Sequence, residues 1–180
     1  MARLKAIVGA LFGLVVLVFG LGFVLPSHNH VQRDILINAE PEAVFAQISD
    51  FHAWENWSPW ANIDPNASMS VEGKGIGQLM TWASENPQVG TGTQEIMELD
   101  APRHLVTHLE FGGEGNANAT FELQPEAGQT RVVWSLDFDA RKGLPLWEQP
   151  VSTYLSYAMD AMIGSSYETG LQNLKAVVEG

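Results

Sequence analysis

The sequence predicts an α+β domain with seven antiparallel strands, two short helices after the first strand and a long C-terminal helix, behind an N-terminal transmembrane helix. Three observations predict this class. An uncharged apolar run opens the chain, short alternating segments separated by turn residues fill its middle, and a pattern of helical period closes it. At 180 residues, one domain and a short appendage fit, and we expect an anchor over 1–27 and a domain over 28–180.

The uncharged run is Ala6–Leu25, with Arg3 and Lys5 before it and Pro26 after it. It has the roughly 20 residues that a helix needs to cross about 30 Å of hydrocarbon. A cleaved secretory signal is the alternative, but such signals have cores of about 7–15 residues and a small-residue cleavage site, which this sequence lacks. We therefore expect an uncleaved single-pass anchor in the inner (cytoplasmic) membrane. Because Lys and Arg favour the cytoplasmic side, the domain should be periplasmic or otherwise extracytoplasmic.

The domain that follows the anchor is strongly acidic. All 21 Asp and Glu residues lie beyond residue 31, together with seven of the nine Lys and Arg residues, which gives this part a formal net charge of −14. Such a charge repels nucleic acid and anionic lipid headgroups, so no nucleic-acid partner is expected. The absence of cysteine excludes disulfides, thiolate metal sites and cysteine nucleophiles.

The first elements of the domain are a strand and two short helices. Val31–Ile37 alternates between two faces, which indicates a strand. Pro41–Ser49 begins with proline between two glutamates, a favoured helix start. A second short helix is predicted over Phe51–Trp57, because Pro59 ends it.

The middle of the domain predicts six further strands, mostly in hairpin succession. In the last of them, apolar residues share one face and polar residues the other, so one side of the sheet should be buried. Beyond them, about 150–178 has the apolar spacing of a long helix. The six strands are expected over Ser68–Glu72, Gln78–Ala83, Thr91–Leu99, Arg103–Phe111, Asn116–Gln124 and Thr130–Asp139.

Two segments resemble a known superfamily. Residues 31–60, VQRDILINAEPEAVFAQISDFHAWENWSPW, and residues 159–179, MDAMIGSSYETGLQNLKAVVE, resemble the opening and the closing helix of SRPBCC/START-like proteins. These helix-grip proteins include polyketide cyclases, lipid-transfer domains and pollen-allergen-like ligand carriers. The resemblance covers nearly all of residues 31–179. It implies a curved sheet wrapped around the long C-terminal helix, with an apolar cavity whose mouth includes the two short helices.

The resemblance also implies that a hydrophobic small molecule or lipid binds in this cavity. Tryptophan and methionine suit an adaptable apolar site, although each candidate could instead pack the core. Trp134 should face the long helix, where Met159 and Met162 lie three residues apart on about the same side. The ligand-binding candidates are Trp54, Trp57, Trp60, Trp82, Phe121, Trp134, Phe138, Tyr154, Met159 and Met162.

The histidines do not predict a metal site. His104 and His108 lie four apart on a strand, roughly 13 Å at about 3.3 Å per residue, which is too far for one zinc with bonds of about 2 Å. His28 and His30 are placed in the linker and lack a third ligand. The glycine-rich segment 73–77 lies between two strands, so it predicts a hairpin turn and not a phosphate-binding loop. We expect no metal and no cofactor.

We favour a membrane-anchored module that binds a hydrophobic small molecule or lipid over an enzyme, and the sequence leaves catalysis undecided. A cyclase or dehydratase that uses cavity carboxylates or histidine is an alternative, as is a regulatory domain whose filled core binds a protein. Buried carboxylates or histidines in the cavity would favour the enzyme. An apolar void would favour binding, and a filled interior would favour interaction.

Overall fold

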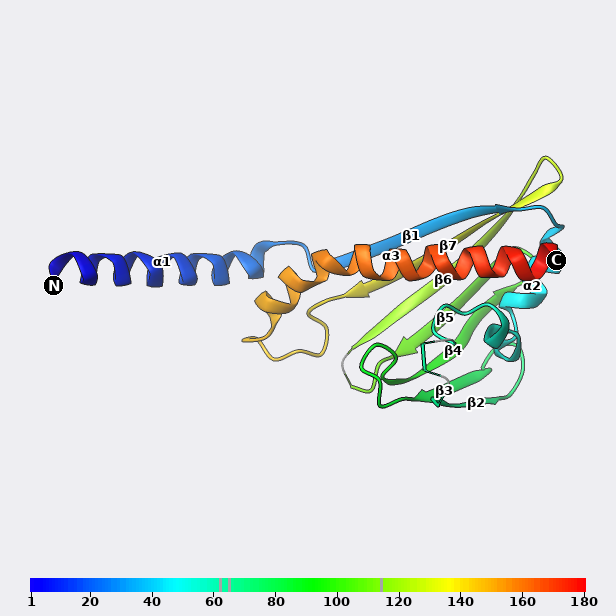
Figure 1. The fold of residues 1–180 in the computed structure, drawn as a ribbon, viewed down its shortest axis with the longest axis horizontal. Coiled ribbons are helices and arrows are strands. Elements are labelled where there is room, and N and C mark those ends of the chain that lie inside the picture. The colour runs from blue at the N-terminus through cyan, green and yellow to red at the C-terminus, as the bar shows by residue number, and fades with distance from the viewer. Residues whose placement is uncertain (62, 65, 114) are drawn as a thin grey trace.

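An antiparallel sheet and a long C-terminal helix build the domain (Figure 1). The computed structural model describes residues 1–61, 63–64, 66–113 and 115–180. Within them, one seven-stranded sheet has the order β1-β7-β6-β5-β4-β3-β2, with every pairing antiparallel. The predicted fold class is thereby confirmed. The strands are β1 His28–Ile37, β2 Ser68–Glu72, β3 Leu79–Ala83, β4 Thr91–Asp100, β5 His104–Glu110, β6 Asn116–Glu126 and β7 Gln129–Asp139.

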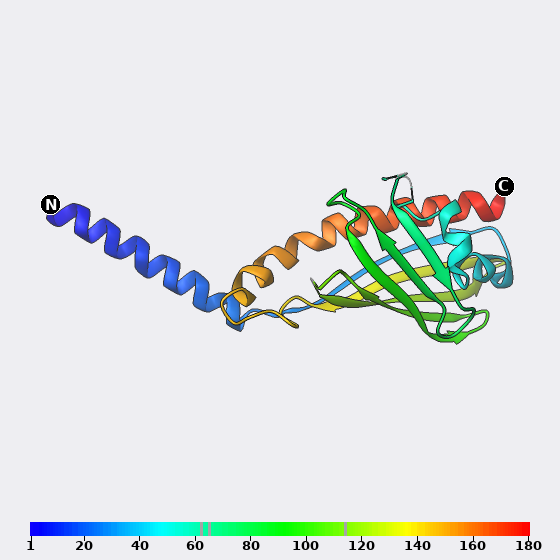
Figure 2. The same cartoon turned by 90° about the horizontal axis from the view of Figure 1, so that it is seen from below.

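Four helical segments accompany the sheet. They are α1 Ala2–Val24, α2 Pro41–Ile48, the 3-10 helix η1 Phe51–Asn56 and α3 Gln149–Glu179. Pro41 occupies the start of α2, as its fixed φ and missing N–H allow. Figure 2 shows α3 running along the hollow side of the sheet, with α2 and η1 near its C-terminal end. The two short helices both contact α3 in this region.

The first strand begins three residues earlier than Val31, its predicted start. His28, Asn29 and His30 pair with Asp139, Phe138 and Asp137 of β7, so they do not form a linker. The imidazole Nδ1 of His30 lies 2.7 Å from Oδ1 of Asp137. Cross-strand pairing of this kind stabilises a sheet and explains the extension, which alternation of apolar and polar residues does not reveal.

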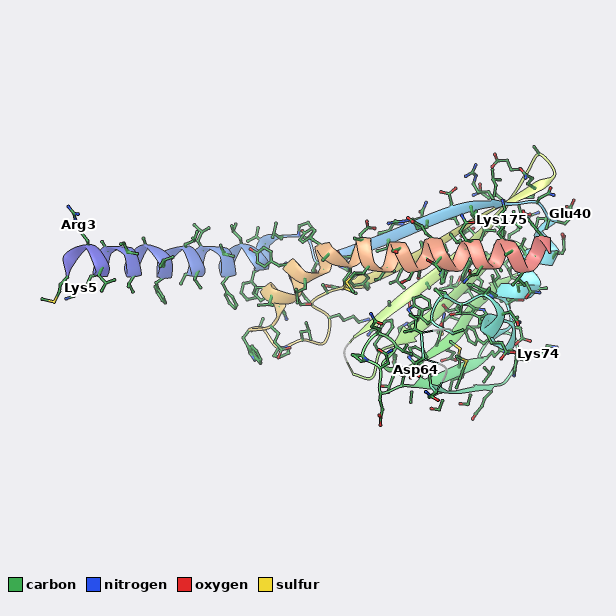
Figure 3. The ribbon with its side chains drawn as sticks, viewed as in Figure 1. Arg3, Lys5, Glu40, Asp64, Lys74 and Lys175 are labelled. Atoms are coloured by element: carbon green, nitrogen blue, oxygen red, sulfur yellow. The ribbon has the colours of Figure 1, made fainter. Side chains whose placement is uncertain are left out.

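The helix α1 projects away from the sheet along the long axis of the molecule (Figures 1 and 2). Arg3 and Lys5 lie at its far end, whereas Lys74 lies at the opposite end of the molecule (Figure 3). Among the described residues, this is the one helix long and apolar enough to cross a membrane. Length and composition of this kind are shared by membrane spans and by signal sequences near an N-terminus.

Candidate functional site: an aromatic cluster between the sheet and the C-terminal helix

Seven aromatic rings meet between the sheet and α3, and we call them the aromatic cluster. Trp134 of β7 is at its centre. Its ring stacks on Tyr167 of α3 with centroids 3.7 Å apart, and on Phe121 of β6 at 4.8 Å. Such contacts contribute beyond the burial of apolar area. The members are Phe51, Trp54, Trp57, Trp60, Phe121, Trp134 and Tyr167.

The strand register explains why the sheet residues of the aromatic cluster lie side by side on one face. Phe121 lies directly opposite Trp134 in the β6–β7 ladder, and Arg33 of β1 lies opposite Trp134 on its other side. Opposite residues in an antiparallel ladder project from the same face. One face of the sheet therefore presents two aromatic rings and one guanidinium group to α3.

Glycines in α3 allow these side chains to approach the helix closely. A Cβ at Gly170 would lie 2.9 Å from Cζ3 of Trp134 and 2.9 Å from Cδ of Pro59. A Cβ at Gly164 would overlap the guanidinium of Arg33. That guanidinium donates from Nε to Glu168 at 2.7 Å, so Arg33 joins β1 to α3 beside the cluster.

Of the cluster's indoles, those of Trp54 and Trp57 have hydrogen-bond partners, whereas the buried indole of Trp134 has none among the described residues. Nε1 of Trp54 donates to the carbonyl of Ile48 at 2.9 Å, and Nε1 of Trp57 donates to that of Gln47 at 3.1 Å. The indole N–H of Trp134 is buried and has no acceptor within hydrogen-bonding distance among the described residues. Leaving a buried donor without a partner costs about 1–3 kcal/mol. This N–H is therefore a polar position that a bound acceptor could satisfy.

A polar link supports the cluster from its η1 side. Gln78 is buried; its Oε1 accepts from the backbone N–H of Phe51 at 2.9 Å, and its Nε2 donates to Asp50 at 2.9 Å. Asp50 also accepts from His52. The hydrogen bonds from Gln78 and then from His52 lower the pKa of Asp50 to about 2. This network fixes the start of η1, the helix that carries Trp54.

The phenol of Tyr167 is the titratable group of the aromatic cluster. Burial, and then the negative charge of Asp137, raise the pKa of Tyr167 above its ordinary value. The phenol therefore remains neutral, because the charged form would lose its hydration. The cluster thus presents neutral rings around the unpaired indole N–H of Trp134.

The structure brings seven of the ten predicted ligand-binding residues to the core. Trp54, Trp57, Phe121 and Trp134 are buried, while Trp60, Trp82 and Phe138 are partly buried against them. Three residues of α3 lie outside this group and are exposed. Tyr154 and Met159 are each 37% exposed, and Met162 is 70% exposed.

Tyr167 and Phe51 were not among the predicted site residues. A signal for Tyr167 exists in the sequence, because it lies four residues before Leu171 and seven before Leu174, and all three are buried on one side of α3. For Phe51, the available signal is its position three residues before Trp54, the same spacing that separates the three tryptophans. Among the described residues, no cluster of three or more His, Cys, Asp and Glu side chains could hold a metal ion.

The comparison with protein families matches residues 28–179 to the family described as polyketide cyclase / dehydrase and lipid transport. No curated protein matches the chain. The family match thus covers the sheet, the short helices and almost all of α3, and it leaves α1 outside.

Solved structures share the fold at low sequence identity. The Zhui aromatase/cyclase from a Streptomyces species has a TM-score of 0.62 at 16% identity, over 84% of this chain and 94% of that one. A protein from Arthrobacter aurescens has a TM-score of 0.58 at 17% identity, over 82% and 86% of the two chains. Ara h 8.0201 has a TM-score of 0.56 at 12% identity, over 84% and 97%. These likenesses show the fold, and with the family match over 28–179 they lead to one conclusion: this chain belongs to the polyketide cyclase/dehydrase and lipid transport family, whose fold supports a hydrophobic ligand-binding domain.

Proposed function

We propose that this protein is a membrane-anchored domain that binds a hydrophobic small molecule or lipid between its sheet and α3, at the aromatic cluster. The observation that carries the proposal is the buried indole N–H of Trp134, which has no acceptor among the described residues. It lies within a group of large apolar rings. The ligand that fits is a largely apolar molecule with an acceptor oxygen, such as a lipid, quinone or isoprenoid derivative.

Burial of apolar surface would drive this binding, at about 25 cal/mol per Å². The indole N–H of Trp134 would also donate a hydrogen bond to a ligand oxygen, which would supply the acceptor that this N–H lacks. Trp60 is the tryptophan of the cluster that is only partly buried, so it marks the side on which the cluster meets solvent. A ligand would enter by displacing this ring and would reach Trp134, whose centroid lies 6.1 Å from that of Trp60.

A cyclase or dehydratase activity is the second candidate, because the family includes such enzymes by description. Acid–base catalysis requires a titratable side chain within hydrogen-bonding reach of the substrate. In the described part of the chain, the buried polar side chains are Ser, Thr and Gln, and none is Asp, Glu or His. We therefore place binding before catalysis.

The ligand test compares two conservative variants. Trp134→Phe removes the unpaired N–H and keeps an aromatic ring, whereas Trp82→Phe removes an N–H that already donates to the carbonyl of Val89 at 3.1 Å. A panel of fatty acids, quinones and isoprenoids is titrated against the full chain in detergent, with tryptophan fluorescence as the signal. Lipid is also extracted from the protein purified from its own membrane and identified by native mass spectrometry.

We expect a member of the panel to change the emission of the unaltered chain. Trp134→Phe should weaken that ligand about tenfold, which corresponds to a hydrogen bond of about 1.4 kcal/mol. Trp82→Phe should leave the affinity unchanged. If no ligand changes the emission and no lipid copurifies, the binding function is refuted, and a protein-interaction domain with a filled core takes its place.

A further inference from the structure

Large apolar side chains are exposed close to the end of α1. They come from the loop between β7 and α3 and from the first turns of α3. Leu146 is 72% exposed, Trp147 69%, Val151 53% and Leu155 65%. A concentration of this kind within ten residues marks an interaction surface, whereas single exposed apolar residues do not. We call these four residues the juxtamembrane face.

Arg141 joins this region to α1 through hydrogen bonds. Its guanidinium donates to the carbonyls of Gly22 at 2.7 Å and Phe23 at 3.0 Å, and also to that of Leu25. The last carbonyls of a helix have no partner within the helix, so a guanidinium that binds them caps its end. The same side chain donates from Nε to Thr153 of α3 at 2.9 Å.

The first turns of α3 lie against the last turns of α1. A Cβ at Gly22 would lie 2.6 Å from Cβ of Pro150, so only glycine allows this approach. The hydroxyl of Tyr154 donates to the carbonyl of Val18 at 2.6 Å. Val18 precedes Val24, the end of α1, by six residues, or about 9 Å at 1.5 Å per residue. The start of α3 is therefore level with about the last 9 Å of the apolar helix.

We propose that the juxtamembrane face is inserted into the membrane interface beside α1, where lipid covers it. The inference rests on the anchoring part of the proposed function, since a helix packed along the last turns of a membrane span must share their depth. Interfacial elements bury their apolar side about 5–10 Å below the headgroups, which matches this depth. Tryptophan, here Trp147, is favoured at that level of a bilayer.

An apolar hollow between the two helices supports lipid as the occupant. It has a volume of about 300 Å³ and lies between the side chains of α1 and the start of α3. Because the domain carries a formal net charge of −14, anionic headgroups would repel it, and contact with the membrane must come from apolar burial. The hollow is lined by Leu14, Val15, Val18, Phe19, Pro150, Val151 and Tyr154.

The chain contains no cysteine, so single cysteines can be labelled without further changes. Trp147→Cys and Leu155→Cys place an environment-sensitive fluorophore on the juxtamembrane face. Ile76→Cys is the matched control, because Ile76 is 66% exposed but lies next to Lys74, at the end of the molecule away from α1 (Figure 3). Val8→Cys reports on α1 itself, where Val8 is 58% exposed. Each full-length variant is reconstituted as one chain per phosphatidylcholine nanodisc, with or without lipid that carries a nitroxide high on its acyl chain.

We expect the nitroxide lipid to quench the labels at 147 and 155 several-fold more than the label at 76. If the label at 8 is quenched but those at 147 and 155 report water, the juxtamembrane face is refuted while the anchor remains. If those two labels are shielded from water and yet unquenched, protein covers the face, and the inference also fails. If the label at 8 is not quenched, both the anchor and the inference are refuted, whereas ligand binding is still decided by the fluorescence titration.

Discussion

Replacing Gly170 by alanine tests how tightly α3 packs on the aromatic cluster. In a helix interior, alanine is more favourable than glycine by about 1 kcal/mol, so an unobstructed site would gain stability. Here the new Cβ would lie 2.9 Å from both Trp134 and Pro59, which is closer than carbon atoms approach. In the ligand-free domain Trp134 is stacked on both Phe121 and Tyr167, and overpacking of this kind costs about 1–3 kcal/mol. We expect G170A to lower the free energy of unfolding by up to about 2 kcal/mol after the helix gain is subtracted.

Gly164→Ala is the matched control in the same helix. Its Cβ would meet the far end of the Arg33 side chain, which is flexible and has solvent beside it. We therefore expect G164A to be close to neutral, because the gain in helix propensity offsets the displaced ion pair. The assay is urea unfolding of the full chain in detergent, followed by tryptophan fluorescence. A G170A chain more stable than the unaltered one, or a G164A chain less stable than G170A, would refute the packing described for Trp134.

Two further predictions concern pH. Asp50 has a pKa near 2 in the folded chain, below its unfolded value of 3.8, so its contribution to stability is present above pH 3.8 and is lost as the pH falls towards 2. Because the carboxylate is 44% exposed and solvent screens it, we expect this contribution to the free energy of unfolding to be about 1 kcal/mol. In Asp50→Asn, the free energy of unfolding should therefore fall less steeply as the pH is lowered from 3.8 to 2. The hydrogen bond to Asp137 raises the pKa of His30 above 6.5, so this pair should stabilise the fold below pH 6.5 and lose its effect as the pH rises through the folded value. NMR titration of His30 should show a raised pKa that returns towards 6.5 in Asp137→Asn; an unchanged titration would contradict the pairing.

The sheet and most of its strands could be predicted because their patterns are local. Alternation in Thr130–Asp139 and the prolines and glycines between strands indicated elements close to those observed. The glycine-rich segment forms the β2–β3 connection, as expected, with positive φ at Gly73, Gly75 and Gly77. The early start of β1 could not be predicted, because it depends on pairing with β7 more than a hundred residues away.

The long helix shows what periodicity leaves undecided. Its apolar residues form one series in the sequence, from Val151 to Val178. In the structure, Leu171 and Leu174 are buried against the sheet side, whereas Leu155 and Met162 are exposed. A hydrophobic stripe indicates that something covers a helix face, but it does not distinguish a sheet from a neighbouring helix or a membrane. For that reason Met159 and Met162 were predicted to line one cavity with Trp134. In the structure both methionines are exposed, whereas Trp134 is buried.

The length of α3 sets a relation between the two proposed sites. Pro150 is beside the end of α1, and Tyr167 is in the aromatic cluster. Tyr167 follows Pro150 by seventeen positions, which correspond to about 26 Å along the helix. If the start of α3 is in the membrane interface, the cluster is well outside the hydrocarbon. A molecule that reaches the indole N–H of Trp134 would then have to leave the bilayer, so the proposed anchor would hold the domain close to the membrane without placing the binding site in it. This geometry favours a domain that extracts or carries a hydrophobic molecule over one that binds lipid within the membrane.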